Sequence, residues 1–126
     1  MENFILHQEL TSTIINAFYK VYNQLGYGFL EKVYENALVF ELKKRGLRVQ
    51  QQVPIKVRYE GNIVGEYFAD ILVEGKVIIE LKAAENISEG HKAQLINYLK
   101  ATEIEVGLIL NFGPKPTFKR KVFTKK

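Results

Sequence analysis

The 126-residue sequence contains no cysteine and only three prolines. Without cysteine, the chain cannot form a disulfide framework or a cysteine-ligated zinc site. Its apolar runs fall far short of the roughly 20 residues that span a bilayer, and Met1 to Phe4 lack a basic segment followed by an apolar one. These absences argue against a disulfide-stapled secreted domain and against a membrane protein. We therefore expect a cytoplasmic protein with no membrane partner.

The scarcity of proline also argues against a long disordered arm. An apolar fraction of 47% with 25% charged residues is ordinary globular composition. A chain of this length is in the commonest size range for one domain, and two cores would leave each half too small to be stable alone. We expect residues 1–126 to form a single domain.

The charged residues are biased toward the basic side, with 18 Lys and Arg against 14 Asp and Glu. The basic residues cluster at 43–48, at Lys56 with Arg58, and at Lys119, Arg120 and Lys121. A net charge of +4 favours a polyanionic partner such as nucleic acid, with the third cluster as a binding surface. An ordinary solvated surface remains an alternative interpretation.

Apolar periodicity predicts two helices before any strand. Residues 9–25 and 30–45 carry apolar side chains at three- and four-residue intervals, and glycines follow each segment. After Gly46 the period becomes two, which predicts strands at 53–59, 63–73 and 76–83 with Pro54 on an edge strand. A third helix from Ser88 to Lys100 and strands at 106–110 and 118–123 complete the chain.

This order predicts a mixed α/β fold in which helices flank a central mixed sheet. The three strands form an antiparallel meander, and the strand-helix-strand step around 88–100 requires a right-handed crossover.

One strand carries charged residues where an apolar pattern is expected. Glu80 and Lys82 follow Ile79 two residues apart, so their side chains lie on one face, roughly 6.6 Å apart by backbone rise. Asp70 is the only aspartate in the chain and lies within a strand pattern, where aspartate is depleted. Two carboxylates are ligands that Mg²⁺ prefers. Two structural alternatives remain: Glu80 and Lys82 could form an internal salt bridge, and Asp70 could accept hydrogen bonds from the amides of a nearby turn.

The register of the hairpin decides whether Asp70 joins Glu80. A two-residue loop of Glu74 and Gly75 would place Asp70 opposite Ile79, on the wrong face. A three-residue loop or one bulge shifts the pairing by one residue and places Asp70 beside Glu80. The site hypothesis therefore predicts an odd loop or a bulge.

Asp70 followed by Glu80-Leu81-Lys82 resembles the Asp…(Asp/Glu)-x-Lys signature of PD-(D/E)XK nucleases, with Ala69 in place of the usual proline. The segment 28–34, with Gly28, Glu31 and Tyr34, resembles the motif that names the GxxExxY family of this superfamily. The segment 94–98 resembles the Gln-Leu-x-x-Tyr element on the following helix. The resemblance covers about residues 10–122 and implies a restriction-endonuclease-like core.

The resemblance implies a nuclease that cuts nucleic acid, with DNA as the expected substrate and Mg²⁺ or Mn²⁺ as cofactor. Its implied catalytic residues are Glu31, Asp70, Glu80, Lys82 and Gln94, of which Glu31, Asp70 and Glu80 would bind the metal. Carboxylates that hold Mg²⁺ and a lysine that orients water or neutralises the oxyanion suit this chemistry independently. The expected substrate-binding residues are Tyr34, His91, Tyr98, Lys119, Arg120 and Lys121.

Alternatives remain for single residues and for the whole chain. Glu31 also suits a helix N-terminal dipole, Tyr34 a core position, and His91 an exposed first helical turn. A non-catalytic nucleic-acid-binding or protein-interaction module on the same fold, or an oligomeric regulatory protein, is the competing class of function. The sequence leaves open DNA versus RNA, endonuclease versus exonuclease, and a homo-oligomeric state.

Overall fold

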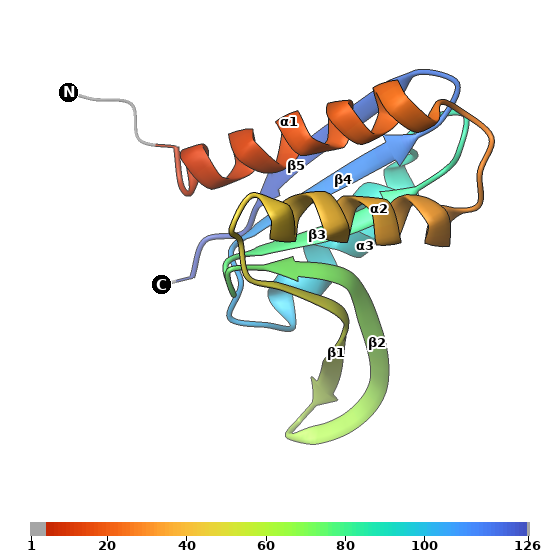
Figure 1. The fold of residues 1–126 in the computed structure, drawn as a ribbon. Coiled ribbons are helices and arrows are strands. Elements are labelled where there is room, and N and C mark those ends of the chain that lie inside the picture. The colour runs from red at the N-terminus through yellow and green to blue at the C-terminus, as the bar shows by residue number, and fades with distance from the viewer. Residues whose placement is uncertain (1–4, 126) are drawn as a thin grey trace.

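A computed structural model describes residues 5–125 of the chain (Figure 1). The elements are α1 (Gln8–Leu25), α2 (Glu31–Lys44), β1 (Val49–Tyr59), β2 (Asn62–Val73), β3 (Val77–Lys82), α3 (Glu89–Lys100), β4 (Val106–Phe112) and β5 (Pro116–Val122). The predicted order of elements and the mixed fold are confirmed. Among residues 5–125, no helix has the length and apolar character needed to cross a membrane.

The five strands form one mixed sheet in the order β1-β2-β3-β4-β5. Only β3 and β4 pair in parallel, and α3 connects them, while the remaining neighbours are antiparallel. The strand that contains Pro54 lies at the edge, as predicted, because a proline cannot donate a ladder hydrogen bond. Helices α1 and α2 cover one face of the sheet, and α3 covers the other (Figure 1).

Strand β3 serves two apolar cores by alternation. Ile79 and Leu81 pack with α1 and α2, whereas Ile78 packs with α3. Because side chains two residues apart share a face, Glu80 is placed on the face of Ile78. The buried character of β3 therefore comes from helices on both faces, and Glu80 is a charged group inside that layer.

The β2–β3 turn has the odd length that the site hypothesis requires. Glu74 and Gly75 adopt positive φ angles of 55° and 62°, and the Lys76 amide donates a hydrogen bond to the Val73 carbonyl at 2.9 Å. Val73 therefore pairs with Val77, and Ile71 pairs with Ile79. The predicted three-residue loop is confirmed, and the next position along the hairpin brings Asp70 opposite Glu80.

Beyond that position β2 leaves β3. The two strands pair only from Ile71 to Val73 on β2, although β2 begins at Asn62. The rest of β2 curves away with β1 as a hairpin that projects from the sheet (Figure 1). Gln52, whose neighbours pair with Ile71 and with Ala69, has a φ of 54°, a region that non-glycine residues rarely occupy. The unusual backbone thus lies directly across from Asp70, where the sheet opens.

Candidate active site

Asp70 and Glu80 meet where β2 and β3 separate. The Asp70 backbone amide donates to Glu80 Oε2 at 3.0 Å, and the Leu81 amide donates to Asp70 Oδ2 at 2.8 Å. Side chains thus replace the backbone ladder at the first position where the strands part. The exchange uses one oxygen of each carboxylate, so it fixes both groups and leaves the second oxygen of each outside it. Glu80 is only 5% exposed.

Burial and neighbouring negative charges destabilise the charged forms of both carboxylates. Burial, and then the charge of Asp70, raises the pKa of Glu80 from its ordinary 4.5 to about 8. Burial is also the main cause that raises the pKa of Asp70, and the charges of Glu35 and Glu31 add to it. A pair of carboxylates with raised pKa values in one opening is typical of a functional site and favours a bound cation.

Glu31 approaches the same place from the start of α2. Its Oε2 accepts a hydrogen bond from the Ala83 amide at 3.3 Å, which ties the first turn of the helix to the end of β3. Its charge raises the pKa values of both Asp70 and Glu80. The predicted residue from the second helix is therefore brought within electrostatic range of the carboxylate pair.

Lys82, at the end of β3, and His91, in the first turn of α3, lie within electrostatic range of each other. Lys82 is half-buried at the end of β3, and its charge lowers the pKa of Glu80 against the larger effect of burial. Burial, and then the charge of Lys82, lowers the pKa of His91. His91 Nδ1 accepts from the Ser88 amide at 3.1 Å, and the His91 amide donates to Ser88 Oγ at 3.1 Å. The imidazole is thus part of a capping box, and its proton is placed on Nε2.

The segment after Lys82 is held by a buried asparagine on β4. Asn111, which is fully buried, accepts from the Ala84 amide at 2.9 Å and donates to the Ala84 carbonyl at 3.0 Å. A Cβ at Gly113 would lie 2.2 Å from that carbonyl oxygen, so only glycine fits there. Asn111 and Gly113 fix the exit of β3, and sequence analysis did not single them out.

Gln94 and Tyr98 line a groove on the α3 side of the site. Tyr98 is 5% exposed and packs against Tyr67 of β2, with ring centroids 5.7 Å apart. Burial, and then the charges of Glu80 and Asp70, raises the pKa of Tyr98 to about 12. The carboxylate pair and the groove are therefore electrostatically connected through Tyr98.

Glu35 is a further acidic residue beside the site that sequence analysis missed. It is 5% exposed, and its carboxylate accepts from the Gln51 side chain at 2.8 Å and from the Gln52 side chain at 3.2 Å. Lys32 forms a salt bridge with it at 3.3 Å. The available signal was its spacing of four residues from Glu31, which places both on one helical face.

The prediction of Tyr34 as a substrate-binding residue needs correction. Tyr34 has no exposed surface, stacks on Phe112 at 4.3 Å, and donates its hydroxyl hydrogen to the Gly26 carbonyl. It is therefore a core residue that holds the α1–α2 loop, because it has no surface to offer a substrate.

The basic cluster on β5 is divided between the two faces of the sheet. Arg120 donates to the Leu6 carbonyl on the α1 side. Lys119 and Lys121 act electrostatically on Glu89 of α3, on the other side. Alternation along the strand explains the division, so the three residues do not form one surface.

The donor set at the opening suits Mg²⁺ or Mn²⁺ in part. Mg²⁺ in proteins uses one or two carboxylates together with waters and substrate phosphate, and Asp70 and Glu80 supply such a pair. No group of three or more His, Cys, Asp or Glu side chains within residues 5–125 is arranged to hold a metal ion. Glu31 instead accepts from the Ala83 amide, and its role in metal binding stays a prediction.

Comparisons with known proteins agree with this geometry. No curated protein matches the chain. A crystal structure described as that of SSO0001 is similar, with a TM-score of 0.56 and 19% identity over 75% of this chain. The chain spans half the length of that protein, and the likeness supports the restriction-endonuclease-like fold. The family model described as "PD-(D/E)XK nuclease superfamily" matches residues 8–122. The chain belongs to the PD-(D/E)XK nuclease superfamily.

Proposed function

We propose that this protein is a divalent-metal-dependent nuclease that hydrolyses phosphodiester bonds, with DNA as its substrate. The observation that carries the proposal is the exchange of hydrogen bonds between Asp70 and Glu80 at the point where β2 and β3 part, with Lys82 on the same strand as Glu80. Family membership supports a nuclease fold. The further steps rest on the chemistry of these side chains.

Asp70 and Glu80 would hold the metal through the carboxylate oxygens that their hydrogen-bond exchange does not use. A bound Mg²⁺ or Mn²⁺ would polarise the scissile phosphate and lower the pKa of a coordinated water. Because both carboxylates have raised pKa values in the metal-free protein, cation binding would displace protons from the pair.

Lys82 would act on charge that develops during the reaction. Its ammonium lies on the strand that carries Glu80, and it donates up to three hydrogen bonds to phosphate oxygens or to the attacking water. His91, with its proton on Nε2, would donate to a phosphate oxygen without carrying a full charge, since its pKa is lowered. Both groups are placed by the ends of rigid elements, β3 and α3.

Glu31 would orient the attacking water rather than bind metal directly. It is exposed, it is anchored to the Ala83 amide, and its charge raises the pKa values of both carboxylates.

We also propose that the protein is a member of the GxxExxY family. Gly28 has a φ of 116°, which favours glycine, Glu31 reaches the site, and Tyr34 fastens the loop between them. Each motif position thus has a physical role. We further propose that the chain is one nuclease domain.

The test is cleavage of supercoiled plasmid DNA with Mg²⁺ or Mn²⁺. The unmutated protein should nick the plasmid, and Asp70→Ala and Lys82→Ala should each abolish nicking. Matched controls are Glu66→Gln, an exposed acid on the same strand as Asp70, and Lys76→Ala, an exposed lysine in the turn that precedes β3. Activity that survives both site substitutions would identify a contaminating nuclease. Binding without cleavage, across metals and across DNA and RNA, would favour the non-catalytic module.

A further inference from the structure

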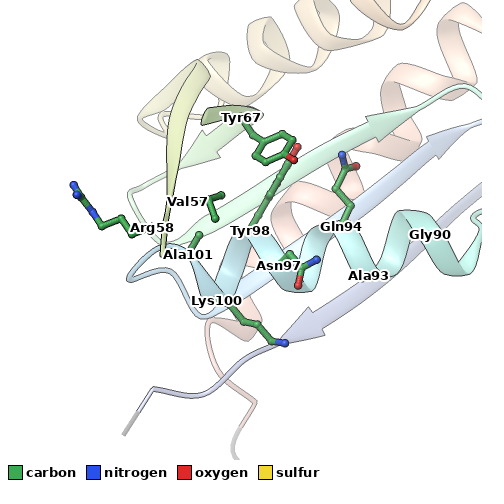
Figure 2. A pocket seen from close by; sticks show the side chains of 10 residues that line it. All are labelled: Val57, Arg58, Tyr67, Gly90, Ala93, Gln94, Asn97, Tyr98, Lys100 and Ala101. Atoms are coloured by element: carbon green, nitrogen blue, oxygen red, sulfur yellow. The ribbon is translucent and has the colours of Figure 1, made fainter. Parts of the chain in front are cut away.

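A groove of about 590 Å³ runs along α3 (Figure 2). It lies between that helix and the part of the β1–β2 hairpin that curves away from the sheet. Its lining residues are Val57, Arg58, Tyr67, Gly90, Ala93, Gln94, Asn97, Tyr98, Lys100 and Ala101. The groove is absent from the sequence-based predictions, because it depends on the bend of the hairpin.

The aromatic part of the groove is a tyrosine ring held in a fixed position. Tyr67 is 50% exposed, and its ring rests on Tyr98 at a centroid distance of 5.7 Å and an angle of 42°. Figure 2 shows the two rings side by side, with the Gln94 side chain on the same side of α3. Because Tyr98 is buried, its contact holds the Tyr67 ring in place. Tyr67 nevertheless remains half exposed, so a flat ligand in the groove could contact its ring.

The polar part of the groove matches the chemistry of a nucleotide. Gln94 and Asn97 carry amides, which donate and accept hydrogen bonds. Arg58 and Lys100 are basic residues at the rim, and their side chains extend outward (Figure 2), with the Lys100 ammonium 5.9 Å from the centre of the Phe123 ring. Among the ten described residues that line the groove, none is acidic. An aromatic platform with amides and cations is the combination that binds bases and phosphates of single strands. An acidic peptide would use the cations but would have little use for the amide pair.

The groove lies near the candidate active site, since the charges of Glu80 and Asp70 act on Tyr98 in its lining. Tyr67 precedes Asp70 by three residues, which is about 10 Å of extended strand. Gln94 and Tyr98 belong to the helix whose N-terminus carries His91. A strand whose phosphate lies at Asp70 and Glu80 would therefore carry its neighbouring nucleotide into the groove.

We propose that the groove binds an unpaired nucleotide next to the scissile phosphate, with its base stacked on Tyr67 and its edge hydrogen-bonded by Gln94 and Asn97. The substrate class would then be single-stranded or locally unpaired nucleic acid. In a duplex the bases are stacked on one another, so their faces are closed to Tyr67 unless a base is extruded. This inference rests on the proposed nuclease function for the position of the phosphate.

The test measures stacking without cleavage. A single-stranded oligonucleotide with one 2-aminopurine is titrated with the protein in EDTA, and the fall in fluorescence on stacking is recorded beside the dissociation constant. Tyr67→Ala should remove the quenching and weaken binding by roughly 5- to 150-fold, the range for one base–aromatic stack. Tyr67→Phe, which keeps the ring, should retain both.

Phe68→Ala is the matched control. Phe68 is 49% exposed on the same strand, and neighbouring strand residues point to opposite faces, so its loss should leave quenching unchanged. Asn97→Asp is a second variant at an exposed helix position, and its added negative charge should weaken binding while the fold persists. Quenching that persists in Tyr67→Ala, or a duplex that binds as tightly as the single strand, would overturn the proposal.

The outcome separates this proposal from the nuclease function. Loss of quenching in Tyr67→Ala alone, in a protein that never cleaves, would support the groove and refute the nuclease. If cleavage requires Asp70 but binding of single strands does not depend on Tyr67 or Asn97, the nuclease function is supported and the proposed groove function is refuted. Tighter binding of an acidic peptide than of any oligonucleotide would assign the groove to a protein partner and refute the proposal.

Discussion

Replacing Glu80 by glutamine should make the protein more stable, and the gain should depend on pH. The substitution removes a buried carboxylate but keeps an oxygen that can accept the hydrogen bond from the Asp70 amide. Because the pKa of Glu80 is about 8 in the folded protein and near 4.5 in the unfolded chain, the folded state binds the proton more tightly. The contribution of Glu80 to stability is therefore fully present below about pH 4.5 and is lost as the pH rises toward 8.

The size of the effect follows from that window. Each pH unit within it costs the folded state about 1.4 kcal/mol, so ionised Glu80 destabilises the protein by at most about 5 kcal/mol above pH 8. This upper limit is comparable to the whole stability of many domains of this size. Glu80→Gln should therefore unfold at a higher urea concentration than the unmutated protein at pH 8.5. The two proteins should differ little at pH 4.

The assay is urea denaturation monitored by circular dichroism at half-unit pH steps from 4 to 9, in EDTA. Glu66→Gln is the control, because Glu66 is an exposed acid on β2 and its removal should give a small difference that is independent of pH. A difference between Glu80→Gln and the unmutated protein that stays constant across the whole pH range would refute the assignment of a raised pKa to Glu80.

Three further predictions concern metal, backbone fit and the basic residues. Mg²⁺ or Mn²⁺ should raise the melting temperature, whereas Asp70→Asn should raise it without metal and abolish the metal effect; a mutant that still responds would place the ion elsewhere. Gly113→Ala should lower the free energy of unfolding by roughly 1–3 kcal/mol in urea titrations, because its Cβ meets the Ala84 carbonyl; an unchanged midpoint would contradict the fit. Neutralising Lys119 and Lys121 should weaken binding to all DNA sequences alike and reduce the salt-dependence slope by about one per lost contact, whereas Arg120→Ala should leave the slope unchanged in the same titrations.

The elements and the sheet could be predicted because their signals are local. Apolar periodicity located the helices, and Pro54 identified an edge strand. The boundaries of β4 and β5 were predicted less well. Strand β4 extends to Phe112, and β5 begins at Pro116. Their pairing continues through Asn111, whose buried side chain binds Ala84. A polar residue inside a strand looks like a strand end when its tertiary partner is unknown.

The candidate site was predictable where strand geometry alone decided it. The alternation on β3 placed Glu80 and Lys82 on one face. The site hypothesis required an odd turn or a bulge to bring Asp70 beside Glu80, and the observed pairing has the odd turn. Glu35 and Tyr67 were missed because their placement depends on the packing of α2 and on the bend of the β1–β2 hairpin. Asn111 was missed because its partner, the Ala84 backbone, is distant in sequence. Burial of Tyr34 was equally invisible, since an aromatic side chain on a helix suits a core and a binding surface alike.

Lys82→Ala offers the most direct test of a nuclease site at this opening. Single-turnover cleavage of a labelled oligonucleotide is measured at saturating protein with Mg²⁺, and binding of the same oligonucleotide is measured in EDTA. If Lys82 acts on charge that develops in the transition state, the variant should bind within about twofold of the unmutated protein and lose cleavage by at least roughly 100-fold. Lys76→Ala should match the unmutated protein in both measurements. Cleavage by Lys82→Ala at the unmutated rate would contradict a catalytic site built on Asp70, Glu80 and Lys82.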